Sequence, residues 1–294
     1  MTAVHDLTPD YLQRMKETPE TLRVGVLAPV DGEGRVQLCE RWTAPFVNNG
    51  METLRLPVEP LPYPDPEQPY KIPVEEILSH IDGLLLPGGH SHIHPSIYMP
   101  YVTRPEDRFE PARDYYAIAL VKAAHKQKIP TLAICRGMQE MGVAFGMHLE
   151  KLEKGFIDHA EGYEHDGNFE RMDELVHDIT VQPGGVLADI FGNITRGVNS
   201  IHEYGFTLDR CRLNEAFRIE ALAPDNVIEA MSSKDRVFLA MQAHPEFNLG
   251  EGKNFWHKGI FGERFERIRE YHQARINHVT AGNTPDFGNL APAT

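Results

Sequence analysis

Thr131-Leu-Ala-Ile-Cys135-Arg-Gly137-Met-Gln139-Glu140 indicates a buried strand that turns directly into a helix. The apolar run ends at Cys135, and Met138, Met141 and Phe145 then recur at helical spacing. A sharp strand-to-helix turn presents its central side chain at the edge of a sheet, where the first N–H groups of the helix favour an anion. The pattern predicts Cys135 as an exposed nucleophile of an α/β protein. Because cysteines are usually buried, a structural core cysteine is the alternative, and a second group of catalytic residues is needed to distinguish the two.

The segments around this turn alternate between strand and helix patterns. Apolar strand patterns cover 22–28, 54–58 and 84–86, and an amphipathic helix is expected within 107–127. This order predicts a parallel sheet with right-handed crossovers and helices on both faces, in a flavodoxin-like three-layer α/β fold. After residue 150 the pattern changes to short strands that we expect to extend the sheet in antiparallel fashion, followed by a helix: 177–181, 217–222, 227–231, 237–241 and the helix 255–278.

Met241-Gln-Ala-His244-Pro245-Glu246 follows another apolar run and supplies partners for a cysteine nucleophile. A nucleophile of this kind needs a base and a group that orients the base. The proline favours an extended segment, so the side chains of His244 and Glu246 project to the same side. Active sites of open α/β sheets lie at the carboxyl ends of strands, which is where both segments are predicted.

Pro87-Gly88-Gly89 ends a third predicted strand. Adjacent glycines let the backbone approach a ligand closely, as an oxyanion hole requires of one N–H donor. The residue after the nucleophile, Arg136, is expected to supply the other donor from its backbone. Pro-Gly-Gly alone is a common turn, so it indicates an oxyanion hole only because it ends a strand before the cysteine segment.

The order Pro-Gly-Gly, Ala-Ile-Cys-Arg-Gly-Met-Gln and Gln-Ala-His-Pro-Glu resembles the class I glutamine amidotransferase superfamily, and more narrowly the γ-glutamyl-γ-aminobutyrate hydrolases of putrescine catabolism. The resemblance covers about residues 22–275 and includes Pro95-Ser-Ile-Tyr98, Ala112-Arg113-Asp114 and Val198-Asn199-Ser200-Ile-His202.

The resemblance implies specific roles for matching residues. Cys135 is the expected nucleophile, His244 the base and Glu246 its orienter, with Gly89 and Arg136 as the oxyanion hole. The residues expected to hold the glutamyl substrate are Gly88, Gln139, Asn199, Ser200 and His202.

Two departures from the subfamily pattern fall beside the expected pocket. Relatives usually continue the Asn-Ser motif with His-His-Gln or His-Gly-Gln, whereas this chain has His202-Glu203-Tyr204. Relatives usually carry tryptophan where this chain has Ala243. Both changes bear on which amine leaves the substrate, and neither touches the nucleophile or its base.

Composition agrees with a soluble enzyme, which we expect in the cytoplasm. The 29 Lys and Arg against 43 Asp and Glu give a formal charge of −14, which disfavours nucleic acid or an acidic membrane as a partner. The N-terminus is too polar for a signal peptide, and no long apolar run exists. The odd set of three cysteines argues against a disulfide framework. We expect one domain over 21–279, mobile ends at 1–20 and 280–294, and by resemblance a homo-oligomer.

Three histidines alternate in Gly89-His-Ser-His-Ile-His-Pro95, so an extended segment would place His90, His92 and His94 on one side. A zinc site is one interpretation of that pattern. We favour exposed loop histidines, because relatives place a substrate-facing loop there without metal, and we expect neither a metal nor another cofactor.

The predicted reaction is cysteine-dependent hydrolysis of a γ-glutamyl amide through a glutamyl thioester. Two alternatives remain open at this stage. The chain could be a glutaminase subunit that supplies ammonia to a synthase partner, with the same chemistry at Cys135. It could also be a catalytically silent relative that binds a ligand or a protein, although the intact Cys135, His244 and Glu246 set argues against this.

Overall fold

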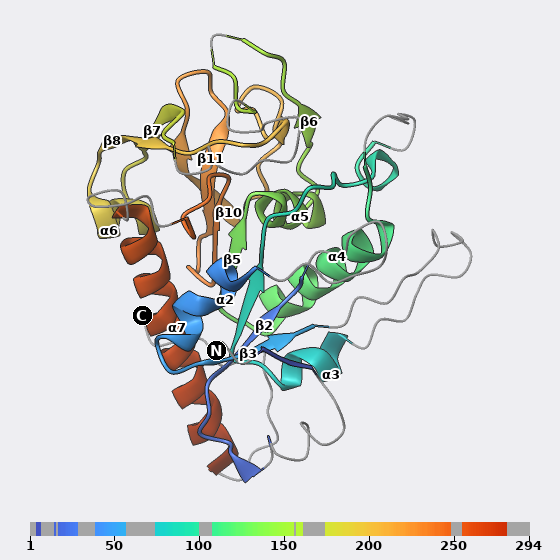
Figure 1. Ribbon diagram of the computed structural model, residues 1–294, viewed down its shortest axis with the longest axis vertical. Helices are drawn as coiled ribbons and strands as arrows, with labels where there is room; N and C mark the ends of the chain where they lie inside the picture. Colours follow the sequence, from blue (N-terminus) through green and yellow to red (C-terminus); the bar gives the residue numbers. More distant parts are fainter. Residues whose placement is uncertain are drawn as a thin grey trace. The chain divides into compact units, whose positions relative to one another are not determined.

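The structure, a computed structural model, describes residues 4–6, 15, 17–28, 39–56, 74–99, 108–155, 157–160, 174–247 and 255–280 (Figure 1). Contacts between Cα atoms divide the chain into two compact units. The first consists of Met1–Pro87, Glu110–Leu132 and Arg264–Thr294, and the second of Gly88–Phe109 and Ala133–Glu263.

The first unit is built on parallel strands. Their order is β1 (Val4–Asp6), β3 (Glu52–Arg55), β2 (Arg23–Val26) and β4 (Gly83–Leu86), with parallel pairing between neighbours. Helix α2 (Glu40–Val47) contacts β3, and α3 (Val74–Ser79) contacts α4 (Pro111–Lys126). Every residue of β2 and β4 is buried, which explains their continuous apolar character.

A buried carboxylate ties the last helix to the strands of this unit. Asp82 has no exposed surface, and it accepts a hydrogen bond of 2.9 Å from the backbone N–H of Arg23. Its other oxygen lies 2.7 Å from Arg275 and 3.0 Å from His272, both in α7 (Phe255–Thr280). Because a buried charge requires such partners, Asp82 holds the second half of α7 in place.

The second unit carries antiparallel strands (Figure 1). Their order is β12 (Phe238–Met241), β11 (Ile228–Ser233), β10 (Phe217–Leu222), β7 (His177–Val181) and β8 (Thr195–Val198). The other elements of this unit are α5 (Arg136–Ala144), α6 (Val186–Phe191), the 3₁₀ turn η1 (Pro95–Ile97) and a two-stranded sheet of β6 (Glu150–Lys151) and β9 (Tyr204–Gly205). Strand β5 (Thr131–Ile134) begins in the first unit and ends in the second.

The predicted elements are largely confirmed. Parallel strands with antiparallel additions are present, and β7 and β10 have the predicted bounds. The predicted 54–58 strand instead begins at Glu52, and 57–58 lie outside the described residues. Part of the 1–20 segment, for which we expected mobility, pairs as β1 with β3, and Asp6 forms an ion pair with Arg55 at 2.6 Å. Residues 281–294 lie outside the described part.

Candidate active site

Cys135 lies at a strained turn between β5 and α5. Its backbone has φ 50° and ψ −109°, a left-handed conformation that is rare and costly for a residue with a side chain. The Cys135 N–H donates to the carbonyl of Met241 at 2.8 Å, and the Cys135 carbonyl accepts from the N–H of Gln139 at 3.2 Å. The strand before it and the helix after it therefore fix this conformation. The strand, turn and helix predicted for 131–140 are confirmed.

The predicted exposure of the thiol is wrong, because the Cys135 side chain is 6% exposed. Gly88 and His244 cover it. A Cβ atom placed on Gly88 would lie 3.6 Å from the Cys135 Cβ and 2.8 Å from the His244 Cε1. Since carbon atoms pack at about 3.5–4.0 Å, only glycine fits beside this imidazole. The turn after β4 and the base thus approach the thiol closely.

His244 and Glu246 form a buried pair as their spacing predicted. The imidazole Nδ1 lies 2.6 Å from the Glu246 Oε1, and the two side chains are 5% and 1% exposed. Burial lowers the pKa of His244, but the Glu246 carboxylate and the Cys135 thiolate outweigh it and raise the pKa to about 10. The imidazolium form of His244 is therefore favoured near neutral pH, beside the side chain of Cys135.

Asn199 clamps the backbone of His244. The His244 N–H donates to the Asn199 Oδ1 at 2.9 Å, and the Asn199 Nδ2 donates to the His244 carbonyl at 3.1 Å. Both bonds are buried, so Asn199 fixes the position of the residue that carries the base. Its predicted role was substrate binding, whereas its amide is occupied by this backbone.

Arg136 connects α5 to the loop that follows Gly89. Its buried guanidinium donates to the carbonyl of Ser91 at 3.0 Å and to that of His92 at 3.4 Å, and it pairs with the buried carboxylate of Glu140. The N–H of Arg136 belongs to the first turn of a helix, a position that favours a negatively charged oxygen. One side chain thus holds together the two segments that carry the predicted oxyanion donors.

The other predicted substrate residues are buried and bonded to protein. Gln139 donates to the carbonyl of Tyr204 at 2.9 Å, and Ser200 donates to that of His159 at 2.7 Å. The Nδ1 of His202 lies 3.0 Å from the carbonyl of Tyr204. Each of these three side chains therefore has a backbone carbonyl of the protein as its partner.

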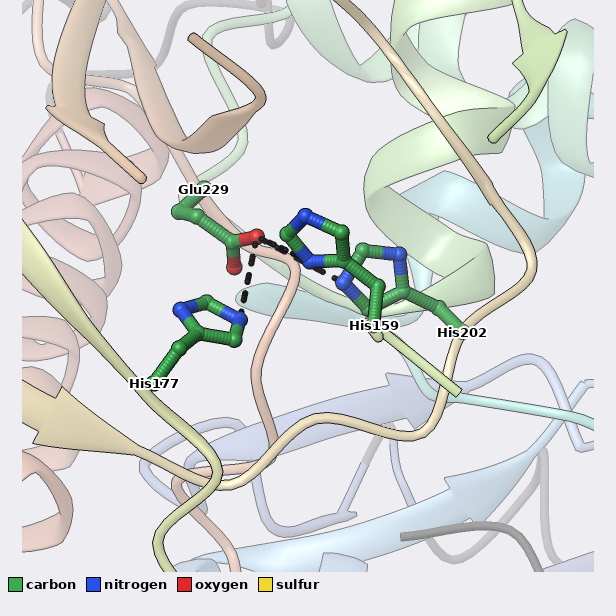
Figure 2. A group of neighbouring side chains, drawn as sticks. All are labelled: His159, His177, His202 and Glu229. Atoms are coloured by element: carbon green, nitrogen blue, oxygen red, sulfur yellow. Dashed lines mark ion pairs between the residues drawn. The ribbon is translucent and has the colours of Figure 1, made fainter. Parts of the chain in front are cut away.

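The alternating histidines of the 90–94 loop have separate surroundings. His92 lies 3.2 Å from the Glu203 carboxylate, and its ring packs 4.5 Å from that of Tyr204. His94 Nδ1 lies 2.7 Å from the hydroxyl of Ser96. Among the described residues, potential metal ligands gather elsewhere, at His159, His177, His202 and Glu229 (Figure 2).

Sequence reasoning missed that four-residue group, apart from His202. Its members come from segments that share no spacing. The one local signal was Glu229, a charged residue within the apolar run Val227-Ile-Glu-Ala-Met231. A fully buried strand glutamate requires a partner, which the sequence does not identify.

A small pocket lies beside His244. Its lining includes Asn199, Ala243, Phe247 and Trp256. The pocket adjoins the position where the family that the sequence resembles usually carries tryptophan instead of Ala243.

Comparisons with known proteins agree with this geometry. The chain belongs to the peptidase C26 family, whose model matches residues 56–246, and it is an amide hydrolase of the class I glutamine amidotransferase superfamily. It is 35% identical over 183 residues to a γ-glutamyl-γ-aminobutyrate hydrolase of Escherichia coli O157:H7, a match that covers 60% of this chain and 69% of that protein. The corresponding enzyme of Escherichia coli K12, PuuD, is 34% identical over the same shares.

A solved structure shares the fold. A Thermoplasma acidophilum protein, described as a candidate subunit of GMP synthase, superposes with a TM-score of 0.56 at 17% identity, over 86% of this chain and 96% of that one. The predicted flavodoxin-like α/β class is confirmed. No helix in the described ranges has the length and apolar character needed to cross a membrane.

Proposed function

We propose that the protein hydrolyses the γ-amide bond of a γ-glutamyl compound through a thioester on Cys135. The observation that carries the proposal is the strained Cys135 turn facing the buried His244–Glu246 pair. This combination supplies a nucleophile, a base and an orienting carboxylate.

The reaction begins with attack of the Cys135 thiolate on the γ-carbonyl carbon. The carbonyl oxygen becomes an oxyanion, which the N–H groups of Gly89 and Arg136 stabilise. The His244 imidazolium gives its proton to the amine nitrogen, and the C–N bond breaks. His244, now neutral, takes a proton from water, and the resulting hydroxide attacks the thioester. Cys135 leaves as a thiolate, and glutamate is released.

The amine that we propose as the leaving group is γ-aminobutyrate or a related glutamylated amine of polyamine catabolism. The support comes from the similarity to the two Escherichia coli enzymes named for γ-glutamyl-γ-aminobutyrate. Glu203 and Tyr204, which differ from the residues usual in the subfamily, both contact His92 in the loop after Gly89. Because both residues contact the same histidine, we propose that together they determine which amine the site accepts.

Activity on a panel of γ-glutamyl amides, with glutamine included, tests the proposal. We expect release of glutamate from γ-glutamyl-γ-aminobutyrate at a higher kcat/KM than from glutamine, and loss of that activity in Cys135→Ala. Near-normal activity of Cys135→Ala would overturn the mechanism. Ammonia release from glutamine only after another protein is added would favour the glutaminase-subunit alternative.

The other two cysteines provide matched controls. Cys39 is exposed, and burial together with Glu150 raises the pKa of Cys211 to about 11. A chloroketone analogue of glutamine should label Cys135 faster than Cys39 or Cys211 at pH 7, because only Cys135 lies in the proposed glutamyl site, as peptide mass spectrometry would show. Cys39→Ala and Cys211→Ala should retain labelling and turnover. A folded wild-type protein that fails to react would support the catalytically silent alternative.

A further inference from the structure

Four buried side chains in the second unit converge on one point. The nearest nitrogens of His159, His177 and His202 lie 3.3, 3.7 and 3.5 Å from the same oxygen of Glu229. The four side chains are at most 4% exposed, and their facing atoms all lie within 4.8 Å of one another. Figure 2 shows the three rings directed at that carboxylate.

The second nitrogen of each ring faces an acceptor. His159 Nε2 lies 2.9 Å from the Asp225 carboxylate, His177 Nδ1 lies 3.2 Å from the Asp178 carbonyl, and His202 Nδ1 lies 3.0 Å from the Tyr204 carbonyl. Because these oxygens only accept, each outer nitrogen carries the hydrogen. In a neutral imidazole the inner nitrogen then presents a lone pair.

With all three imidazoles neutral, three lone pairs and a carboxylate face one another inside the protein. None of the facing atoms has a hydrogen-bond partner: His159 Nδ1, His177 Nε2, His202 Nε2 and both oxygens of Glu229. Acceptors so arranged repel one another unless positive charge lies between them. A single divalent cation supplies it, and its two charges balance the carboxylates of Glu229 and Asp225.

We propose that His159, His177, His202 and Glu229 bind one divalent transition-metal ion, with Zn²⁺ the best fit. Three imidazoles and one carboxylate form a ligand set that zinc takes in tetrahedral sites. Zinc–ligand bonds of about 2.0–2.1 Å place tetrahedral ligands about 3.3–3.4 Å apart, close to the distances of 3.3, 3.5 and 3.7 Å between the three histidine nitrogens and the Glu229 oxygen. The acceptors behind the imidazoles act as the outer partners that orient metal-bound histidines.

The ion would connect segments that lie far apart in the chain. His177 begins β7 and Glu229 lies in β11, whereas His159 and His202 lie outside the strands. The carbonyl of His159 also accepts hydrogen bonds from the N–H of His202 at 2.9 Å and from the Ser200 hydroxyl at 2.7 Å. Because four protein ligands complete a tetrahedron, the site is structural and leaves no position for substrate.

The cluster also borders the segments that hold the base. Asn199, which clamps the His244 backbone, precedes by one and three residues Ser200 and His202, which both donate to the His159 carbonyl. The N–H of Gln242 donates to the carbonyl of Glu229 at 2.8 Å. Loss of the ion is therefore expected to loosen the support of His244 without removing any reacting group.

Metal content and Co²⁺ absorption of the full-length chain, free of any histidine tag, test the proposal. The Cys135→Ala background removes the active-site thiolate as a competing ligand. We expect about one zinc per chain after purification, removal by a chelator, and about one Co²⁺ bound on titration with the visible bands of a tetrahedral N/O site. The temperature of thermal unfolding should fall on chelation and recover with Zn²⁺.

Variants locate the ion. In the same background, His177→Gln and Glu229→Gln should lose the stoichiometric Co²⁺ spectrum, whereas His278→Gln, in the other unit, should keep it. If the cluster variants do not fold, titration of the parent protein still decides. A parent protein that binds neither Co²⁺ nor Zn²⁺ stoichiometrically, or cluster variants that bind as the parent does, would overturn the site and show that protons hold the cluster together.

Discussion

Substitution of Gly88 by alanine should displace the base His244 without removing any reacting group. The new Cβ atom would lie 2.8 Å from the Cε1 of His244, against a carbon–carbon optimum of about 3.5–4.0 Å. The ring has little room to yield, because Glu246 holds its Nδ1 at 2.6 Å and Asn199 holds its backbone on both sides. Relief of the contact therefore requires a shift of roughly 0.7–1.2 Å.

A shift of this size predicts a large loss of turnover. Misplacement of a catalytic group by about 1 Å costs on the order of 100-fold in rate. We expect kcat of Gly88→Ala on a γ-glutamyl amide to fall by about that factor, and alkylation of Cys135 at pH 7 to slow, because the displaced imidazole no longer lies where it can accept the proton of the thiol. Steady-state kinetics and timed labelling measure the two effects, and circular dichroism establishes that the variant is folded.

Gly262 offers the matched control, since a Cβ atom there has no neighbour within 4 Å. It lies in α7, so Gly262→Ala should leave kcat unchanged and stabilise the protein by up to about 1 kcal/mol. A folded Gly88→Ala that keeps kcat within about twofold of wild type would refute the inference that the glycine provides space for the base.

Three further predictions concern protonation and packing. Because the pKa of His244 is raised from 6.5 to about 10 in the folded protein, its contribution to stability is complete below pH 6.5 and is lost as pH rises towards 10. The free energy of unfolding in urea should therefore fall between pH 7 and 10, and fall less in His244→Gln. Gly142→Ala should lower the free energy of unfolding in urea by about 1–3 kcal/mol, because its Cβ would overlap the buried Phe206 ring. Glu140→Ala should cost about 3–5 kcal/mol in the same assay, since the buried guanidinium of the first helical turn loses its carboxylate.

The parts of the site that the sequence predicted are those encoded locally. The strand, the turn at Cys135 and the helix follow from one continuous pattern, and the His244–Glu246 pair follows from a spacing of two across a proline. The burial of the thiol was not predictable in this way. It depends on Gly88, which lies 47 residues earlier in the chain and approaches only in the folded protein.

The cluster around Glu229 was even less predictable from the sequence. His159 and His177 lie in segments without a metal-binding spacing, and their common target is 70 and 52 residues further along the chain. The alternating histidines at 90–94 had the more suggestive pattern, yet His92 lies against Glu203 instead. Periodicity predicts which face of a strand is buried, whereas the convergence of ligands depends on the register between strands.

The Asn199-Ser200-Ile-His202 segment contributes both to the surroundings of His244 and to the cluster around Glu229. By resemblance it was expected to hold the substrate, but each of its polar side chains is bonded to protein: Asn199 to the His244 backbone, Ser200 to the His159 carbonyl and His202 to the Tyr204 carbonyl. A segment with these bonds positions the base and leaves few side-chain groups for the substrate. Among the residues that differ from the relatives, Glu203 keeps an exposed side chain, which is 42% exposed at its contact with His92. Tyr204 and Ala243 are buried, each 1% exposed, and Ala243 directly precedes His244, so two of the three departures from the relatives lie in packed surroundings.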